Sequence, residues 1–294
     1  ANTAVGANTL FTNTTGTFNV ALGNGALYAN TTGDDNVGIG KNSLDTNTTG
    51  DENTAVGRDA LTANTTASEN TAVGAYSLGT NTTGAANVAV GRGALQVNTT
   101  GGFNTAVGTG SSTENTTASN NTAFGGEAMK KTTTASSNTA VGTSALACNT
   151  TGATNVALGM QALKANTTGE HNTAVGHNSL LANLTANQNV AVGNYTLDAS
   201  TAGPNTAVGY CALSNVTGGA GNVAIGDLAG TDAVVNIVNG NNYIVLGNTS
   251  STNAYIKIDW TVTSDLRDKM NIESVPYGLD FVNQITPIKY RFKK

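Results

Sequence analysis

Charged and aromatic residues are scarce in this chain of 294 residues, at 11% and 5%, and it has only two histidines and two cysteines. So few carboxylates, imidazoles and thiolates leave little material for acid–base or metal chemistry. We therefore expect no enzyme, no cofactor and no bound metal. Two cysteines also exclude a disulfide scaffold and a thiolate zinc site.

Long apolar runs and net positive charge are missing as well. No stretch approaches the roughly 18 uninterrupted apolar residues of a membrane span. The net charge of −5 does not suit a nucleic-acid surface. We expect neither membrane insertion nor nucleic-acid binding. The chain begins at Ala1 without an initiator Met or a signal peptide, so we expect its N-terminus to have been processed or cut from a longer protein.

What the sequence does have is a repeat of 17 residues. The unit Asn-Thr-Ala-Val-Gly-x-x-Ala-Leu-x-x-Asn-Thr-Thr-Gly-x-x runs through residues 2–229. Every step is 17 residues except the 16 between Asn189 and Asn205, beside Pro204. We number the positions of each unit from its opening asparagine, which falls at Asn2, Asn19, Asn36, Asn53, Asn70, Asn87, Asn104, Asn121, Asn138, Asn155, Asn172, Asn189, Asn205 and Asn222.

Several positions of the unit hardly vary. Position 5 is Gly in all fourteen units, position 4 is always apolar, and position 9 is Leu in eleven. The ninth unit follows the pattern closely, so its members serve as the structural residues of the repeat: Asn138, Val141, Gly142, Leu146 and Asn149.

The unit is too short for two helices, and its Gly, Asn and Thr disfavour helix. Its opening alternates with period two, which is typical of a strand. We expect positions 2 and 4 to point inward and the Ala and Gly of positions 3 and 5 to point outward. A second short strand would carry Ala-Leu, and Asn-Thr-Thr-Gly would form the corner. The sequence thus predicts an all-β fold, a parallel β-roll or solenoid of about fourteen coils stacked about 4.8 Å apart.

One such coil would bury about two large apolar side chains, too few for stability alone, so stacking is obligatory. The bare Ala and Gly face would let another chain pack closely. We therefore expect the protein to be its own partner, associating through that face.

The repeat fades after Gly230. We expect three parts: a β-roll over 1–230, a β-rich transition over 231–260 that several chains build together as a β-prism, and a short helix-containing segment over 261–294. Pro276 and Pro287 bracket the expected helix at 277–285.

The last segment resembles the opening of the intramolecular chaperone domain that ends many phage tail fibres and tail spikes, including endosialidases. The resemblance rests on the run Ser264-Asp265-Leu266-Arg267-Asp268-Lys269-Met270-Asn271-Ile272, on Pro276-Tyr277-Gly278-Leu279 and on Ile285-Thr286-Pro287-Ile288-Lys289-Tyr290. About thirty residues match, and the family's domain is longer. In that family the serine cleaves its own chain with a lysine five residues on as base, which implies Ser264 and Lys269 as the pair. The alternative is a helix N-cap and a surface lysine.

The repeats separately resemble the β-roll head of trimeric autotransporter adhesins. Both resemblances imply an extracellular homotrimeric fibre, of a virion tail or of a cell surface, that attaches to a host receptor or glycan. The alternatives are a bacterial adhesin head and an ice-binding solenoid with stacked threonines at positions 2, 13 and 14. An inward position 2 argues against the latter. A polysaccharide-degrading tail spike would need paired carboxylates in a groove lined by aromatic residues, which we do not find in the sequence.

Other candidate sites have simpler interpretations. The Asn-Thr-Thr corners match the N-glycosylation signal in nine units, from Asn13 to Asn166, and we favour asparagine stacking at turns instead. Acidic residues gather at positions 16 and 17 as Asp34, Asp35, Asp51, Glu52 and Glu69. For these we favour solvation over a calcium ladder, because the calcium-roll signature is absent.

Three further features remain. His171 and His177 lack the partners of a metal set, and Cys148 and Cys211 lie too far apart to bridge. The seventh and eighth units depart most from consensus, with Ser112 in place of Leu and Lys130-Lys131-Thr132 at the corner entry. A fibre can contact a receptor at such coils, although loosely specified corners are the simpler explanation.

Overall fold

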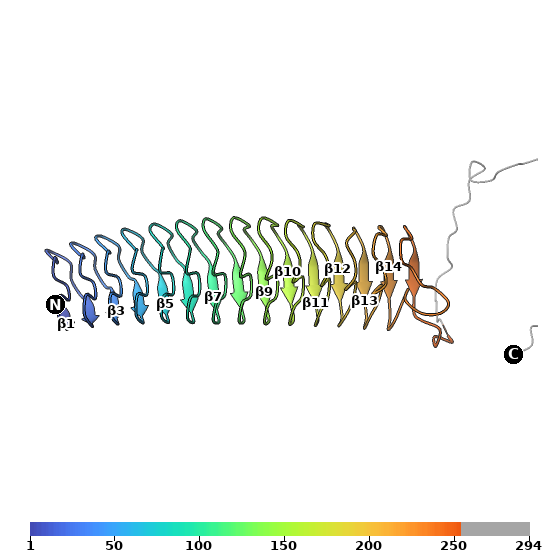
Figure 1. The fold of residues 1–294 in the computed structure, drawn as a ribbon, viewed down its shortest axis with the longest axis horizontal. Coiled ribbons are helices and arrows are strands. Elements are labelled where there is room, and N and C mark those ends of the chain that lie inside the picture. Colours follow the sequence, from blue (N-terminus) through green and yellow to red (C-terminus); the bar gives the residue numbers. More distant parts are fainter. Residues whose placement is uncertain (254–294) are drawn as a thin grey trace, which may run out of the picture. The chain divides into compact units, whose positions relative to one another are not determined.

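The computed structural model describes residues 1–253, of which residues 1–252 form a single β-solenoid (Figure 1). Its one sheet is parallel and contains fifteen strands in sequence order. The strands are β1 (Thr3–Val5), β2 (Val20–Leu22), β3 (Val37–Ile39), β4 (Thr54–Val56), β5 (Thr71–Val73), β6 (Val88–Val90), β7 (Thr105–Val107), β8 (Thr122–Phe124), β9 (Thr139–Val141), β10 (Val156–Leu158), β11 (Thr173–Val175), β12 (Val190–Val192), β13 (Thr206–Val208), β14 (Val223–Ile225) and β15 (Ile244–Leu246). The predicted all-β solenoid with one coil per 17 residues is confirmed.

Each strand pairs in register with the strand one repeat away. In the middle of the rod Thr139 lies opposite Val156 and Val141 opposite Leu158. Within residues 1–253 no helix is long and apolar enough to cross a bilayer.

The predicted second strand is wrong, because the rest of each coil is a chain of turns. After the strand comes the position-5 glycine, whose φ lies between 127° and 139° in all fourteen coils. Positions 7, 9 and 17 then take the left-handed conformation, which at position 9 gives the leucines φ values of 48° to 52°. A bulky residue rarely adopts this conformation, and here burial of the leucine stabilises it. Left-handed backbone at alternate residues curls the chain and prevents an extended strand.

The predicted direction of the strand side chains is also wrong. Position 3 points inward: Ala21, Ala140 and Ala157, for example, are fully buried. Positions 2 and 4 point outward, and Val141 is 39% exposed. The coil is so narrow that only alanine fits opposite the leucine of position 9. Each coil therefore buries one large apolar side chain, not two.

The hydrophobic core is a column of these leucines flanked by the alanines of position 3 and by the alanine, serine or threonine of position 8. The column is interrupted at the seventh coil, where Ser112 replaces Leu. The buried apolar residues accordingly form two clusters, one ending at Ala106 and the other starting at Ala123.

Asparagine side chains complete the interior. The opening asparagines stack in one ladder, in which Asn155 donates its backbone N–H to Oδ1 of Asn138 at 2.8 Å. The corner asparagines of position 12 stack in a second ladder, in which Nδ2 of Asn166 donates to Oδ1 of Asn149 at 2.9 Å. Both ladders converge on one carbonyl per coil, since Nδ2 of Asn138 and Nδ2 of Asn149 both donate to the oxygen of Gly152. A polar group buried without such partners costs free energy, so the ladders fix the coil's cross-section.

The solenoid continues beyond the expected boundary at 230. β15 pairs with β14 in the same sheet after a longer step, with Val223 opposite Ile244. The described part of the expected transition, 231–253, thus adds a strand to the solenoid, closed by an isolated antiparallel bridge between Thr231 and Asn236. The expected helix at 277–285 lies outside the described residues.

Candidate functional site

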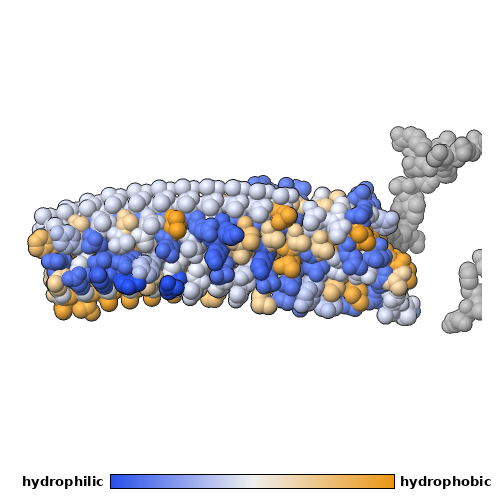
Figure 2. All heavy atoms as spheres, viewed as in Figure 1, coloured by the Kyte–Doolittle hydropathy of each residue, from blue (hydrophilic) through white to orange (hydrophobic). Residues whose placement is uncertain are grey.

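The outer face of the sheet is the most extended surface feature of the solenoid. We call the side chains of positions 2 and 4, together with Ile244 and Leu246, the outward stripe. In Figure 2 apolar spheres line the lower edge of the rod, the edge along which the strands run in Figure 1. The stripe continues from β1 to β15 without a break, because every strand adds two residues to it.

The composition of the outward stripe is uniform. None of its residues is charged, and position 2 is Thr or Val in all fourteen coils. Position 4 is aliphatic or aromatic everywhere and includes Phe124, which is 55% exposed. Isolated exposed apolar residues are ordinary, but a continuous patch on a soluble protein marks an interaction surface. The arrangement can hold an apolar partner that has the same repeat.

The expected face for association was the Ala and Gly face, and this expectation is wrong. The alanines are inside the coil, and the position-5 glycines stack on one another within the chain. A Cβ on Gly142 would lie 2.6 Å from the carbonyl carbon and oxygen of Gly159. The glycine is required by its own neighbouring coil, at a φ of 132°.

The five structural residues of the ninth coil take distinct places. Asn138 and Asn149 are buried in the two ladders, and Leu146 is fully buried in the core. Gly142 is the stacked glycine, and Val141 belongs to the outward stripe. The sequence predicted that these residues matter for the repeat but placed Val141 on the wrong side.

The Asn-Thr-Thr corners are ladder residues, as predicted. Eight of their nine asparagines are 1% exposed or less, and only Asn13 in the first coil is more open. The threonine that follows is also engaged: Oγ1 of Thr31 donates to the carbonyl of Thr48 at 2.9 Å. In these coils the asparagine amide is committed to the interior, so the corner is explained by turn chemistry.

Two of the acidic residues near the first corners, Asp34 and Asp51, bind the backbone of a neighbouring coil. Oδ1 of Asp34 accepts the N–H of Thr17 at 2.6 Å and its hydroxyl at 2.9 Å. These hydrogen bonds lower the pKa of the Asp34 carboxyl. Asp51 accepts the N–H of Asp34 in the same way. Within residues 1–253 no cluster of three His, Cys, Asp or Glu side chains is arranged to hold a metal ion.

The histidines and cysteines form no metal set within the described residues. His177 packs edge-on against Tyr195, with ring centroids 5.1 Å apart, and His171 is exposed. Cys148 and Cys211 are both free and half-buried, as the spacing predicted. Burial raises the pKa of the Cys211 thiol.

Ser264 and Lys269 lie outside the described residues, so their self-cleavage remains a prediction from resemblance. Comparisons with protein-family models, with curated proteins and with solved structures found no match.

Proposed function

We propose that this chain is a structural and adhesive extracellular fibre, a homotrimer whose rods associate along the outward stripe. The observation that carries the proposal is the stripe itself: fifteen consecutive strands present uncharged side chains, and position 4 is always apolar. Burying such a surface is favourable by about 25 cal/mol per Å².

A second copy of this chain is the partner that fits. Its stripe repeats at the same spacing, so parallel copies match side chain for side chain along the whole rod. The resemblance of the C-terminal segment to a trimerising chaperone supports three chains. A virion tail fibre and a bacterial surface adhesin both satisfy this proposal, and both place the rod outside the cell.

The mass of the native assembly tests the proposal. The full chain is compared with a variant that carries V107E, V141E and V175E in β7, β9 and β11. A control carries T100E, T134E and T168E, which add the same charge at exposed threonines of position 14. We expect trimers for the wild type and the control, and monomers with retained β-structure for the stripe variant. A monomeric wild type, or a stripe variant that still forms trimers, would contradict the proposal.

An ice-binding solenoid is the second candidate, and one observation favours it. An inward position 2 was the argument against ice binding, and in the structure position 2 points outward. Eight of the fourteen coils display a threonine hydroxyl and methyl group at position 2, at Thr3, Thr54, Thr71, Thr105, Thr122, Thr139, Thr173 and Thr206, and the other six have valine there. Both functions need the same face, so a trimer that buries the stripe excludes ice binding there. Thermal hysteresis of a monomeric wild type would support the second candidate.

A further inference from the structure

A groove runs along a different part of the coils from the outward stripe. It encloses about 690 Å³ and is lined by positions 6, 7 and 10 of the fifth to ninth coils. Tyr76 lies at one end of the groove and Lys130 toward the other end. Arg92 and Gln96 lie between them. None of the lining residues belongs to a strand, so the groove and the stripe use different residues.

The groove exists because side chains are missing from its floor. Position 7 carries a side chain in most coils, such as Asn42 or Gln161, but is glycine at Gly25, Gly93 and Gly110, of which only the last two are in adjacent coils. These two glycines lie in the sixth and seventh coils, and the groove also extends over the eighth. Two neighbouring coils that lose bulk at the same place leave a hollow where the rest of the rod is filled.

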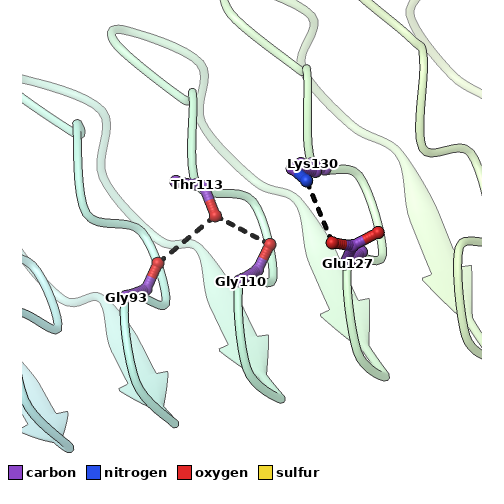
Figure 3. Close-up of polar contacts among 5 residues, drawn as sticks. All are labelled: Gly93, Gly110, Thr113, Glu127 and Lys130. Carbon is purple, nitrogen blue, oxygen red and sulfur yellow. Dashed lines mark hydrogen bonds and ion pairs between the residues drawn. The ribbon is translucent and has the colours of Figure 1, made fainter.

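The polar atoms of the floor and one wall are already paired (Figure 3). Oγ1 of Thr113 donates to the carbonyls of Gly110 at 2.8 Å and Gly93 at 3.4 Å. Nζ of Lys130 donates to Oε1 of Glu127 at 2.9 Å, which raises the pKa of Lys130.

The backbone N–H groups of the floor are also used. Those of Gly93 and Gly110 donate to the carbonyls of Ala75 and Arg92. These two N–H groups are therefore not available to a ligand. A ligand must be held by the side chains of the walls.

The wall residue Tyr76 has one open ring face. The guanidinium of Arg58 covers the other face, 4.7 Å from the ring centroid. In the next coil the same position is Gly93, so position 7 of that coil supplies no side chain to cover the second ring face. By contrast, Tyr195 has ring contacts with both His177 and Tyr210. An open aromatic face beside hydroxyl and amide groups suits the C–H face of a sugar ring.

Arg92 is the second wall residue that is available to a ligand. It is exposed, and within residues 1–253 its guanidinium has no hydrogen bond or ion pair, unlike Lys130. A guanidinium is best satisfied by a carboxylate, which it binds with two parallel hydrogen bonds.

We propose that this groove binds an acidic oligosaccharide, with a sugar ring on Tyr76 and a carboxylate on Arg92. The inference rests on the adhesive part of the proposed function and locates it at the fifth to ninth coils, with both ligand contacts in the fifth and sixth. Over its four coil steps the groove is about 19 Å long, enough for a short oligosaccharide. Its volume lies within the range of known ligand sites, about 300–1,000 Å³.

The test measures binding of the full chain to tetragalacturonate, tetramannuronate and a sialylated trisaccharide, each beside its neutral methyl ester. R92Q removes the free cation, and G110N fills the floor with the residue that other coils hold at this position. Asparagine tolerates the left-handed φ of 67° at Gly110. K41Q is the matched control, because Lys41 occupies the same position as Arg92 in a coil outside the groove.

We expect at least one acidic probe to bind and its ester to bind weakly. R92Q should weaken binding by about tenfold or more, as for one charge-assisted contact, and K41Q should leave it unchanged. G110N should abolish binding. Failure of every probe, equal binding of acid and ester, or binding that survives R92Q and G110N would overturn the inference. The assembly mass is measured on the same samples, so a trimer that binds no glycan refutes the groove alone, and a monomer that binds refutes the fibre alone.

Discussion

Oδ1 of Asn115 and Oγ1 of Thr132, which occupy position 12 of adjacent coils, are both buried and lack a hydrogen-bond partner within the described residues. Everywhere from Asn13 to Asn115 the next asparagine donates its amide to the preceding Oδ1, as Asn98 does to Asn81 at 2.8 Å. Threonine has no amide to donate. Thr132 therefore opens a gap in the ladder, which leaves one polar atom unsatisfied in the seventh coil and one in the eighth.

Thr132→Asn should close this gap. Nδ2 of the new asparagine would donate to Oδ1 of Asn115, and its Oδ1 would accept from Nδ2 of Asn149. These two hydrogen bonds should raise the free energy of unfolding by about 1–3 kcal/mol. Urea denaturation measures this change in the free energy of unfolding. Asn98→Thr is the matched control, because it opens the same kind of gap in an intact part of the ladder and should destabilise. An unchanged stability for Thr132→Asn would show that the gap costs nothing.

Ser112→Leu should join the two halves of the core. Ser112 has a φ of 47°, close to that of the leucines at the same position, so the backbone is already suited to leucine. We expect stabilisation by about 1–2 kcal/mol from the added apolar burial. Leu163→Ser, the reverse change in a regular coil, should destabilise by about 3 kcal/mol or more. Loss of stability in Ser112→Leu would indicate overpacking.

Gly142→Val should disrupt the rod far more than Thr143→Val. The valine would combine a forbidden φ with a clash against Gly159, whereas Thr143 is exposed. We expect a loss above about 3 kcal/mol for the first variant and little change for the second. Thermal melting followed by circular dichroism compares them, and equal melting temperatures would refute this account of the glycine column.

Asp232 should make the C-terminal end of the solenoid sensitive to acid. Its carboxylate accepts the N–H groups of Val234, Val235 and Thr249, and these hydrogen bonds lower its pKa. A lowered pKa in the folded state means that this stabilisation is present above the ordinary value of about 4. It is lost as the pH falls through the folded-state pKa.

Asp232→Asn should therefore reduce the hydrogen-exchange protection of residues 231–249 at pH 7. In the wild type this protection should fall toward pH 3, and in the variant it should fall less. Asp227→Asn serves as the control, because within residues 1–253 the Asp227 carboxylate accepts from the Asn248 side chain and from no backbone N–H. Identical pH profiles for wild type and Asp232→Asn would contradict the prediction.

Chains that end at Trp260 should assemble poorly if residues 261–294 begin a trimerising chaperone. A coil buries at most one large apolar side chain at position 9, so no coil nucleates folding alone, and a slip by one repeat gives nearly the same contacts. A tether at one end fixes the register and raises the effective concentration. Light scattering of the 1–260 fragment measures the outcome. A homogeneous trimer in normal yield would show that the segment is dispensable.

The sequence predicted the coil length, the parallel sheet and the corner asparagines, because each depends on spacing alone. It did not predict which strand face is buried, because period-two alternation defines two faces without saying which is inside. A signal was present: position 3 is Ala in thirteen coils and Gly38 in the other, whereas position 4 ranges from Val to Phe124. A narrow interior tolerates one size, and an outer surface tolerates several.

The groove was beyond prediction for a related reason. Ser112 and Lys130 were recognisable as departures from the repeat, but the hollow depends on Gly93 and Gly110 meeting in adjacent coils. Glycine is common throughout the chain, so these two do not stand out until the coils are stacked.

The ladders connect each residue only to its equivalents one coil before and one coil after. A duplication or deletion of one whole unit therefore leaves every donor and acceptor in the regular coils matched. Such a gene can lengthen or shorten its product in steps of about 4.8 Å without a new folding problem. The length of the rod can thus change in evolution without any change in the irregular coils. Only the distance of these coils from the two ends of the rod changes.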